Sequence, residues 1–250
     1  MSHYSCSVTL KNFELISFAT AGELAQTVAS AWLDEIEAVN RAGKIHCVAL
    51  SGGRIARKFF SAVAEQAGTR SVSFGRVHFF WADERCVLPD DPESNFYLAK
   101  ELLFTPLKVV ATQIHRIRGE DSPEVAAKVA STEISQIAPM NAAGQPVLDL
   151  IFLGLGEDGH VASLFPGESN VLILDKVIYR VVNNSPKPPP NRVTLGYAEI
   201  TAARQVWVLV SGAGKETALR ESLGSQGRTP LARLTQFRTR TKIFCDFSLT

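Results

Sequence analysis

Side chains that can do acid–base chemistry gather in one glycine-rich segment of this chain, Gly154-Leu155-Gly156-Glu157-Asp158-Gly159-His160. The segment follows an apolar run, and its glycines, Gly159 among them, let the backbone present His160 beside Asp158. A loop histidine is a candidate general base because its ordinary pKa lies close to neutral pH. The other histidines are poorer candidates, because three fall in expected strands, where a structural role is favoured, and one stands near the N-terminus. They are His46, His78, His115 and His3.

The same segment formally satisfies the dinucleotide-binding pattern Gly-x-Gly-x-x-Gly. That pattern should open a full crossover helix, but only 161–165 separates it from Pro166-Gly167, and it lies two-thirds along the chain. We therefore reject a dinucleotide site.

Two loops that follow expected strands contain groups able to bind a ligand. One offers backbone N–H groups, and the other offers charged side chains. In Ser51-Gly52-Gly53-Arg54, backbone N–H groups beside a helix N-terminus can hold a phosphate; a tight turn without a ligand is the alternative. In Asp83-Glu84-Arg85, Arg85 can clamp a phosphate or stabilise an oxyanion, and Asp83 can accept hydrogen bonds from a polyol. A surface ion pair is the alternative for that second loop.

Two further cations stand at the starts of expected elements. Lys215 lies in the first turn of an expected helix, where it opposes the helix dipole unless an anion lies between them. Its loop is not a Walker A loop, because residue 209 is Leu and Lys215 is followed by Glu216, so ATP is not indicated. Arg192 follows a run of prolines, and both a ligand role and a surface charge stay open for it.

Covalent and metal chemistry find no support in the sequence. It contains no Gly-x-Ser-x-Gly elbow and no histidine–carboxylate spacing typical of a metal site, and the adjacent His46 and Cys47 fall inside an expected strand. The loops together favour acid–base chemistry on a phosphorylated polar substrate, without a metal or cofactor.

The elements that would position these loops alternate between helix and strand. Thr20 and Glu23 form a capping box before a helical apolar pattern over 21–41, and Ser122-Pro123 predicts the start of a helix to about 137. Further helices are predicted at 55–63, 95–103 and 215–223, and strands at 45–50, 77–81, 114–117, 148–153, 177–182, 192–196, 205–210 and 242–247. Such strands predict a single α/β domain over 1–250, Rossmann-like, with a mostly parallel central sheet and helices on both faces.

Composition limits the classes of partner. With 26 basic and 25 acidic residues the net charge is +1, so we expect no binding to nucleic acid or to an anionic membrane surface. No apolar run approaches the roughly 18 residues of a membrane span, and the N-terminus lacks a leader pattern. Four scattered cysteines are typical of reduced thiols and predict a cytoplasmic protein. The oligomeric state stays open.

Taken together, the loops resemble those of the glucosamine-6-phosphate isomerase/6-phosphogluconolactonase family, and its lactonases in particular. The resemblance spans about residues 45–220, and Asp158–Pro166 is its most specific part. It also includes Ser51-Gly52-Gly53, Trp81–Arg85 with Ser94-Asn95, Lys187–Leu195 and Gly214-Lys215.

The resemblance implies hydrolysis of 6-phospho-D-glucono-1,5-lactone, a small phosphorylated sugar lactone, to 6-phosphogluconate in the pentose phosphate pathway. His160 would take a proton from the attacking water, Asp158 would orient the ring, and Arg85 with loop N–H groups would stabilise the oxyanion. Ser51, Gly52, Gly53, Arg192 and Lys215 would hold the phosphate. Arg54, Asp83, Asn95 and Gly159 complete the implied substrate-binding residues.

The chain departs from the family pattern at two places. Arg54-Ile55-Ala56 stands where the family has a small hydroxyl residue followed by Thr-Pro, so Arg54 either adds a charge or points away, and residues 231–250 lack the usual closing pattern. One alternative is a glucosamine-6-phosphate deaminase, disfavoured because Ser163–Pro166 replaces a Phe-Asn-Glu-Pro-like sequence. The other is a sugar-phosphate-binding protein without catalytic activity.

Overall fold

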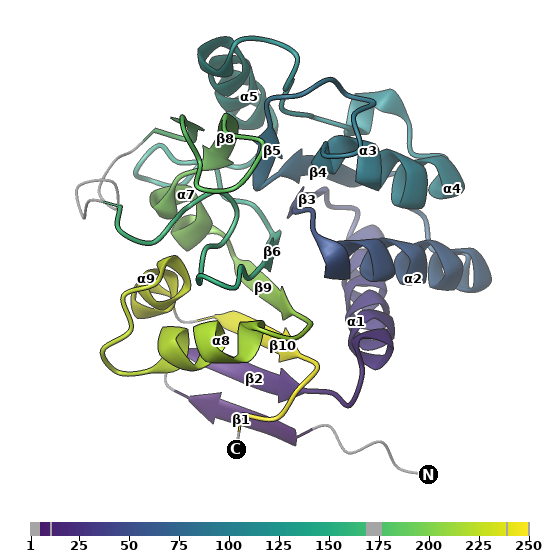
Figure 1. The fold of residues 1–250 in the computed structure, drawn as a ribbon. Helices are drawn as coiled ribbons and strands as arrows, with labels where there is room; N and C mark the ends of the chain where they lie inside the picture. The colour runs from purple at the N-terminus through teal and green to yellow at the C-terminus, as the bar shows by residue number, and fades with distance from the viewer. Residues whose placement is uncertain (1–5, 11, 169–176, 239, 250) are drawn as a thin grey trace.

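The central sheet holds seven strands in the order β1-β2-β10-β9-β6-β3-β4 (Figure 1). The computed structural model describes residues 6–10, 12–168, 177–238 and 240–249. Every neighbouring pair is parallel except β1 with β2, which confirms the mostly parallel sheet. The strands are β1 (Cys6–Leu10), β2 (Phe13–Ser17), β3 (His46–Leu50), β4 (Val77–Trp81), β6 (Leu150–Gly154), β9 (Gln205–Val210) and β10 (Thr241–Cys245).

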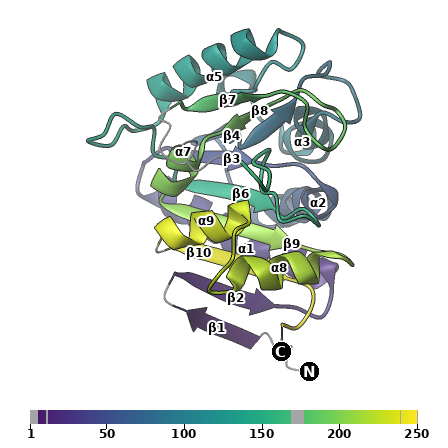
Figure 2. The same cartoon turned by 60° about the vertical axis from the view of Figure 1, so that its left-hand side comes forward.

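Helices cover both faces of this sheet, as expected. Figure 2 shows α8 (Lys215–Leu223) and α9 (Pro230–Phe237) in front of the sheet and α1 (Ala21–Arg41) behind it. On α1, the Trp32 ring lies 5.8 Å from the Phe59 ring of α2 (Arg54–Arg70) and 5.1 Å from the Phe152 ring of β6. All three rings are buried, so the hydrophobic effect stabilises the packing of both helices against the sheet.

The ends of α1 follow from local sequence. The Glu23 N–H donates to Thr20 Oγ1 at 3.1 Å, and the Glu23 carboxylate accepts from the Ala19 N–H at 3.2 Å, so the predicted cap is formed. Gly43 follows the last turn with φ of +66°, a conformation that favours glycine. The helix therefore begins and ends where the sequence predicts.

A second, antiparallel sheet has the order β5-β8-β7 and was not predicted. Its strands are β5 (Asp83–Arg85), β8 (Arg192–Leu195) and β7 (Tyr179–Val182), and α5 (Pro123–Ile137) packs on it. Ala82 joins the two sheets, because its N–H donates to the Leu50 carbonyl of β3 while its own carbonyl accepts from the Leu195 N–H. The predicted strands near 177–182 and 192–196 therefore exist but lie outside the central sheet.

Other segments differ from the prediction. Residues 114–117 form a single bridge, between Ile114 and Phe79, in which the His115 N–H donates to the Phe79 carbonyl, and no strand. The predicted helix at 95–103 is α3 (Asn95–Ala99), which continues as the π-helix η1 (Lys100–Phe104) and as α4 (Thr105–Leu107). Strands β1 and β2 and the helices η2 (Ala111–Gln113), α7 (Tyr197–Ala202) and α9 were not predicted. Among the described residues, no helix combines the length and apolar character needed to cross a bilayer.

Candidate active site

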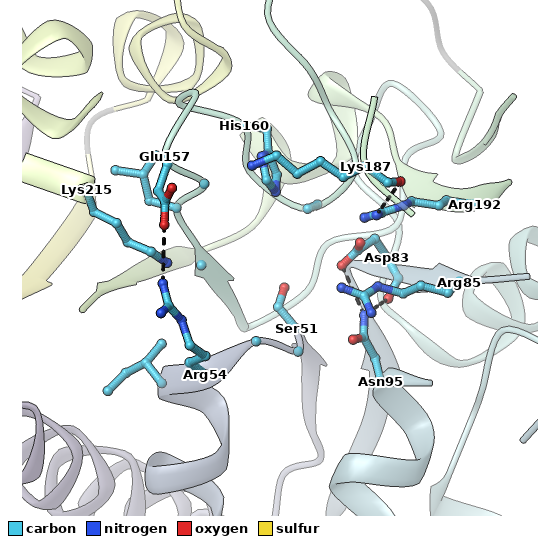
Figure 3. Close-up of a pocket in the computed structure, with 17 residues that line it drawn as sticks. Ser51, Arg54, Asp83, Arg85, Asn95, Glu157, His160, Lys187, Arg192 and Lys215 are labelled. Atoms are coloured by element: carbon cyan, nitrogen blue, oxygen red, sulfur yellow. Dashed lines mark hydrogen bonds and ion pairs between the residues drawn. The ribbon is translucent and has the colours of Figure 1, made fainter. Parts of the chain in front are cut away.

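A pocket of about 290 Å³ opens where the loops after β3 and β6 meet the second sheet (Figure 3). Ligands in open parallel sheets bind at this carboxyl edge of the strands. The predicted site residues that line the pocket are Ser51, Gly52, Gly53, Arg54, Asp83, Arg85, Asn95, His160, Arg192 and Lys215. Asp158 and Gly159 do not line it, because Asp158 contacts the His160 ring and Gly159 packs against Thr229.

Glycines shape the loop that carries His160. A Cβ atom on Gly156 would lie 2.0 Å from His160 Nδ1, and one on Gly159 would lie 2.6 Å from Thr229 Cγ2. Gly159 also has a φ of +83°, which favours glycine. Residues 155–165 form no helix, which agrees with the rejection of a dinucleotide site. Gly156 therefore allows the imidazole to pack closely against the loop, and Gly159 allows Thr229 to do so.

The His160 imidazole is held by Asp158, whose Oδ1 lies 2.5 Å from Nδ1. Because a carboxylate accepts hydrogen bonds, we assign the proton to Nδ1, which leaves Nε2 as the basic nitrogen. Burial lowers the pKa of His160, and the charge of Lys187 acts in the same direction, whereas Asp158 acts in the opposite one. The imidazole is therefore mainly neutral at neutral pH, as a general base must be.

The Asp158 carboxyl group, which accepts from that imidazole, is charged. Burial acts to raise its pKa, but the hydrogen bond from His160 and the nearby charges of His160 and Lys187 lower it overall. Asp158 is therefore ionised at neutral pH and can stabilise a proton that arrives on His160.

Asp83 and Asn95 form the wall of the pocket on the side of the second sheet. Asp83 Oδ2 accepts from the Ser163 hydroxyl at 2.7 Å, and Asn95 Nδ2 donates to the Asp83 carbonyl at 2.9 Å. Both Asp83 and Asn95 are buried, so Asp83 is not part of a surface ion pair, whereas Arg85 of the same loop lies 3.5 Å from the exposed carboxylate of Glu93. Gly52 lies against them, since a Cβ atom there would lie 1.9 Å from Asn95 Oδ1.

Glu84 joins β5 to the N-terminus of α3. Its carboxylate accepts from the N–H groups of Arg85, Asn95 and Phe96 and from the Ser94 hydroxyl, at distances between 2.7 and 3.0 Å. Complete burial raises the pKa of Glu84 to about 7, although the backbone hydrogen bonds act in the opposite direction. This carboxyl group fixes the backbone on which Arg85 and Asn95 stand.

Arg85 and Arg192 lie together on this side of the pocket (Figure 3). Arg85 Nη1 donates to the Glu93 carbonyl at 2.7 Å, while its buried Nε has no hydrogen-bond partner among the described residues. Arg192 donates from Nε and Nη2 to the carbonyls of 187–189 and is only 3% exposed. Burial lowers the pKa of Arg192, and the charge of Arg85 adds to this effect. An anionic group on this side would relieve that repulsion.

Arg54 and Lys215 lie on the other side of the pocket, with Glu157 (Figure 3). Arg54 Nη2 is 3.3 Å from Glu157 Oε1, and both side chains are exposed. Burial lowers the pKa of Lys215, and the charge of Arg54 adds to this effect. The helices α2 and α8 begin here, and their N-caps, Gly53 and Gly214, provide no side-chain hydrogen bond. Two uncapped N-termini and two cations suit an anion.

Two polar pocket residues were not among the predicted site residues, Glu157 and Lys187. Each stands inside a segment on which the resemblance rests. Glu157 adjoins Asp158 in the glycine-rich segment, and Lys187 opens the proline run before Arg192. The motifs contained the signal, but the approach of Lys187 to the carboxylate of Asp158, at 3.5 Å, depends on the fold.

The remaining histidines that the structure describes lie outside the pocket. His46 Nε2 accepts from the buried Trp32 indole at 3.2 Å. His78 and His115 share a hydrogen bond of 2.9 Å, and His115 also contacts the Glu133 carboxylate at 2.7 Å. His3 lies outside the described residues. In the part of the chain that the structure covers, no group of three or more His, Cys, Asp or Glu residues is arranged to hold a metal ion.

Comparison with known proteins agrees with this geometry. Residues 19–243 match the family of glucosamine-6-phosphate isomerases and 6-phosphogluconolactonases. The chain belongs to this family. A 6-phosphogluconolactonase of Treponema pallidum is 35% identical over 197 residues, which are 79% of this chain and 80% of the relative. That of Haemophilus influenzae is 35% identical over 174 residues, 70% of this chain and 72% of the relative.

Solved structures support the same family. The devB protein aligns with a TM-score of 0.84 and 32% identity over 93% of this chain and 96% of its own. The 6-phosphogluconolactonase of Trypanosoma brucei aligns with a TM-score of 0.81 and 27% identity over 92% and 94%. A monomeric glucosamine-6-phosphate deaminase, 19% identical with a TM-score of 0.74 over 92% and 96%, shares the fold alone. Within the glucosamine-6-phosphate isomerase/6-phosphogluconolactonase family, the similarity is therefore greater to these lactonases than to this deaminase.

Proposed function

We propose that this protein hydrolyses 6-phospho-D-glucono-1,5-lactone to 6-phospho-D-gluconate by general-base catalysis at His160. The observation that carries the proposal is a mainly neutral imidazole with Lys187 near it, in a pocket that has two further cations on one side and two on the other. The substrate carries an anion at one end, and its reacting carbonyl becomes anionic at the other end during hydrolysis. The two cationic sides match these two charges.

In this mechanism His160 Nε2 takes a proton from water as the water oxygen bonds to the lactone carbonyl carbon. Asp158 stabilises the imidazolium that forms, because its Oδ1 already accepts from Nδ1 at 2.5 Å. When the tetrahedral intermediate collapses, the bond between C1 and the ring oxygen breaks, and the imidazolium gives its proton to that oxygen. His160 thereby returns to its neutral form, and the product carries a new carboxyl group.

We assign the phosphate to the side formed by Ser51-Gly52-Gly53, Arg54 and Lys215. Uncapped N–H groups of α2 and α8 and two cations can neutralise a dianion there. Arg85 stabilises the oxyanion on the opposite side. The resemblance suggested that Arg192 shares the phosphate with Lys215; because Arg192 lies beside Arg85, we assign it to the oxyanion side instead.

We assign recognition of the substrate hydroxyl groups to Asp83 and Asn95. Both side chains are buried at the wall and line the pocket, so their polar atoms have fixed positions against a polyol. Asp83 Oδ1 accepts a long hydrogen bond from Asn95 Nδ2, at 3.4 Å. We assign this oxygen as the acceptor for a substrate hydroxyl. We also propose a cytoplasmic location, on the sequence grounds given above.

The proposal is tested by offering the purified protein three compounds without added metal. The compounds are 6-phosphogluconolactone, glucono-1,5-lactone and glucosamine 6-phosphate, and lactone loss is corrected for the spontaneous reaction. We expect rapid hydrolysis of the phosphorylated lactone, slower hydrolysis of gluconolactone and no ammonia from the amino sugar. Ammonia release without lactone hydrolysis would support the deaminase alternative. If both reactions are absent, the lactonase proposal fails, and sugar-phosphate binding is measured next.

A further inference from the structure

One carboxylate oxygen in the site has two cationic or potentially cationic neighbours. Asp158 Oδ1 lies 2.5 Å from His160 Nδ1 and 3.5 Å from Lys187 Nζ. The backbone N–H of His160 also donates to this oxygen, at 3.4 Å. The imidazole and the ammonium group therefore both interact with the negative charge of Asp158.

The backbone that carries Lys187 is held in place. Its carbonyl accepts from Arg192 Nη2 at 3.0 Å and from the Ser185 hydroxyl at 2.9 Å, and its N–H donates to the same hydroxyl at 3.2 Å. Arg192 is buried, and the hydrogen bonds that anchor Lys187 are partly buried. The Lys187 side chain is 41% exposed, lines the pocket and is held near Asp158 by the position of its own backbone.

The consequence for His160 follows from charge. A carboxylate that bonds only to an imidazole stabilises the imidazolium and raises its pKa, whereas a nearby ammonium opposes that effect. The charged groups that act on His160 are Asp158 and Asp83, which favour the imidazolium, and Lys187, which disfavours it. Lys187 is the cation among these three groups.

We propose that Lys187 is a positioning residue that shares Asp158 with His160 and so limits how firmly this carboxylate holds a proton on the imidazole. The inference rests on the proposed role of His160 as the base. With Lys187 in place, Asp158 orients the ring yet leaves Nε2 free to accept a proton from water. Without Lys187, Asp158 serves the imidazole alone, and a larger fraction of the enzyme holds a protonated His160 in mildly acidic solution.

The test compares Lys187→Met, which removes the charge, with Lys187→Arg, which keeps it. Lys128→Met, on the exposed face of α5, is the matched control for loss of a lysine charge. The His160 imidazole is titrated by NMR in each protein, which needs no turnover, and kcat/KM for the phosphorylated lactone is measured against pH. Thermal unfolding shows whether each variant is folded.

We expect the pKa of His160 to rise in Lys187→Met and to stay near that of the wild type in Lys187→Arg and Lys128→Met. Because the base form then disappears at higher pH, kcat/KM of Lys187→Met should fall about threefold at pH 6 and less than about twofold at pH 8. An unchanged pKa in folded Lys187→Met, or an equal change in Lys187→Arg, would overturn the inference. If the wild type fails to hydrolyse the lactone while the pKa still rises, the proposed function fails and the coupling between Lys187 and His160 stands.

Discussion

Lys215 and Arg54 stand on the same side of the pocket, but their surroundings differ. Lys215 is half-buried, and burial lowers its pKa, whereas Arg54 is 74% exposed and already paired with Glu157. A cation that water screens poorly interacts more strongly with a phosphate than an exposed, paired one does. The two residues should therefore contribute unequally to substrate binding.

Replacing Lys215 with Met should raise KM for 6-phosphogluconolactone about tenfold or more, as expected for loss of a charged hydrogen bond. Arg54→Met should raise it only about threefold because of its exposure. Neither variant should change kcat/KM for glucono-1,5-lactone by more than about twofold, since that substrate has no phosphate. Steady-state kinetics on both lactones give the comparison. An equal loss of kcat/KM on the two substrates would contradict the assignment of the phosphate to this side of the pocket.

At this scale, the residue type and its loop were enough to predict which side chains gather at the pocket. His160, Arg85, Asp83 and Lys215 all line the pocket, because each stands at the carboxyl end of a strand or at the start of a helix. Lys187 was missed because its place beside Asp158 is created by a fold contact 29 residues away in sequence, which no local pattern encodes. Asp158 was predicted beside His160, but its place outside the pocket depends on the turn between them.

The loop after β6 is the element that sets the position of the imidazole. Gly156→Ala should displace the ring from Asp158, because the new Cβ atom would lie 2.0 Å from His160 Nδ1. We expect kcat/KM for the phosphorylated lactone to fall roughly 100-fold, the order of loss for a catalytic group misplaced by about 1 Å. Gly68→Ala in α2 is the matched control, since a Cβ atom there has no neighbour within 4 Å. Retention of more than half the activity by Gly156→Ala would contradict this account of the loop.

Glu84 gives the β5–α3 junction a dependence on pH. Burial raises its pKa from 4.5 to about 7, so folding favours its protonated form, and this contribution to stability is lost as the pH rises from about 5 to about 8. Glu84→Gln removes the titration, so the Tm of the wild type minus that of the variant should decrease over this range. Thermal unfolding of both proteins at several pH values measures the difference. A difference that stays constant or increases with pH would mean that Glu84 is ionised throughout.

Elements with a strong local pattern were predicted best. The capping box and apolar spacing of α1 located both of its ends, and α8 begins at Lys215 as predicted. The second sheet could not be foreseen, because residues 179–182 and 192–195 read as ordinary strands and only the turn at Ala82 sends their partner out of the central sheet. Helix α7 was missed because its six residues are too few to show a helical period.

At the scale of the whole molecule, both sheets share one buried core. Trp32, Trp81 and Trp207 come from α1, β4 and β9, and all belong to the same apolar cluster as Tyr179 of the second sheet. A core shared in this way predicts cooperative unfolding. Tryptophan fluorescence and far-UV circular dichroism should therefore give the same unfolding midpoint. Two separated transitions would instead divide the chain into independent domains and contradict the single domain expected from the sequence.

The central claim is that His160 is the base for lactone hydrolysis, and one measurement tests it most directly. The rate of 6-phosphogluconolactone hydrolysis above the spontaneous rate is compared among the wild type, His160→Gln and His78→Gln, whose histidine lies outside the pocket. We predict a loss of about 100-fold or more in His160→Gln, the scale of general-base catalysis, with His78→Gln close to the wild type. If folded His160→Gln hydrolyses the lactone as fast as the wild type, His160 is not the base and the mechanism proposed here is wrong.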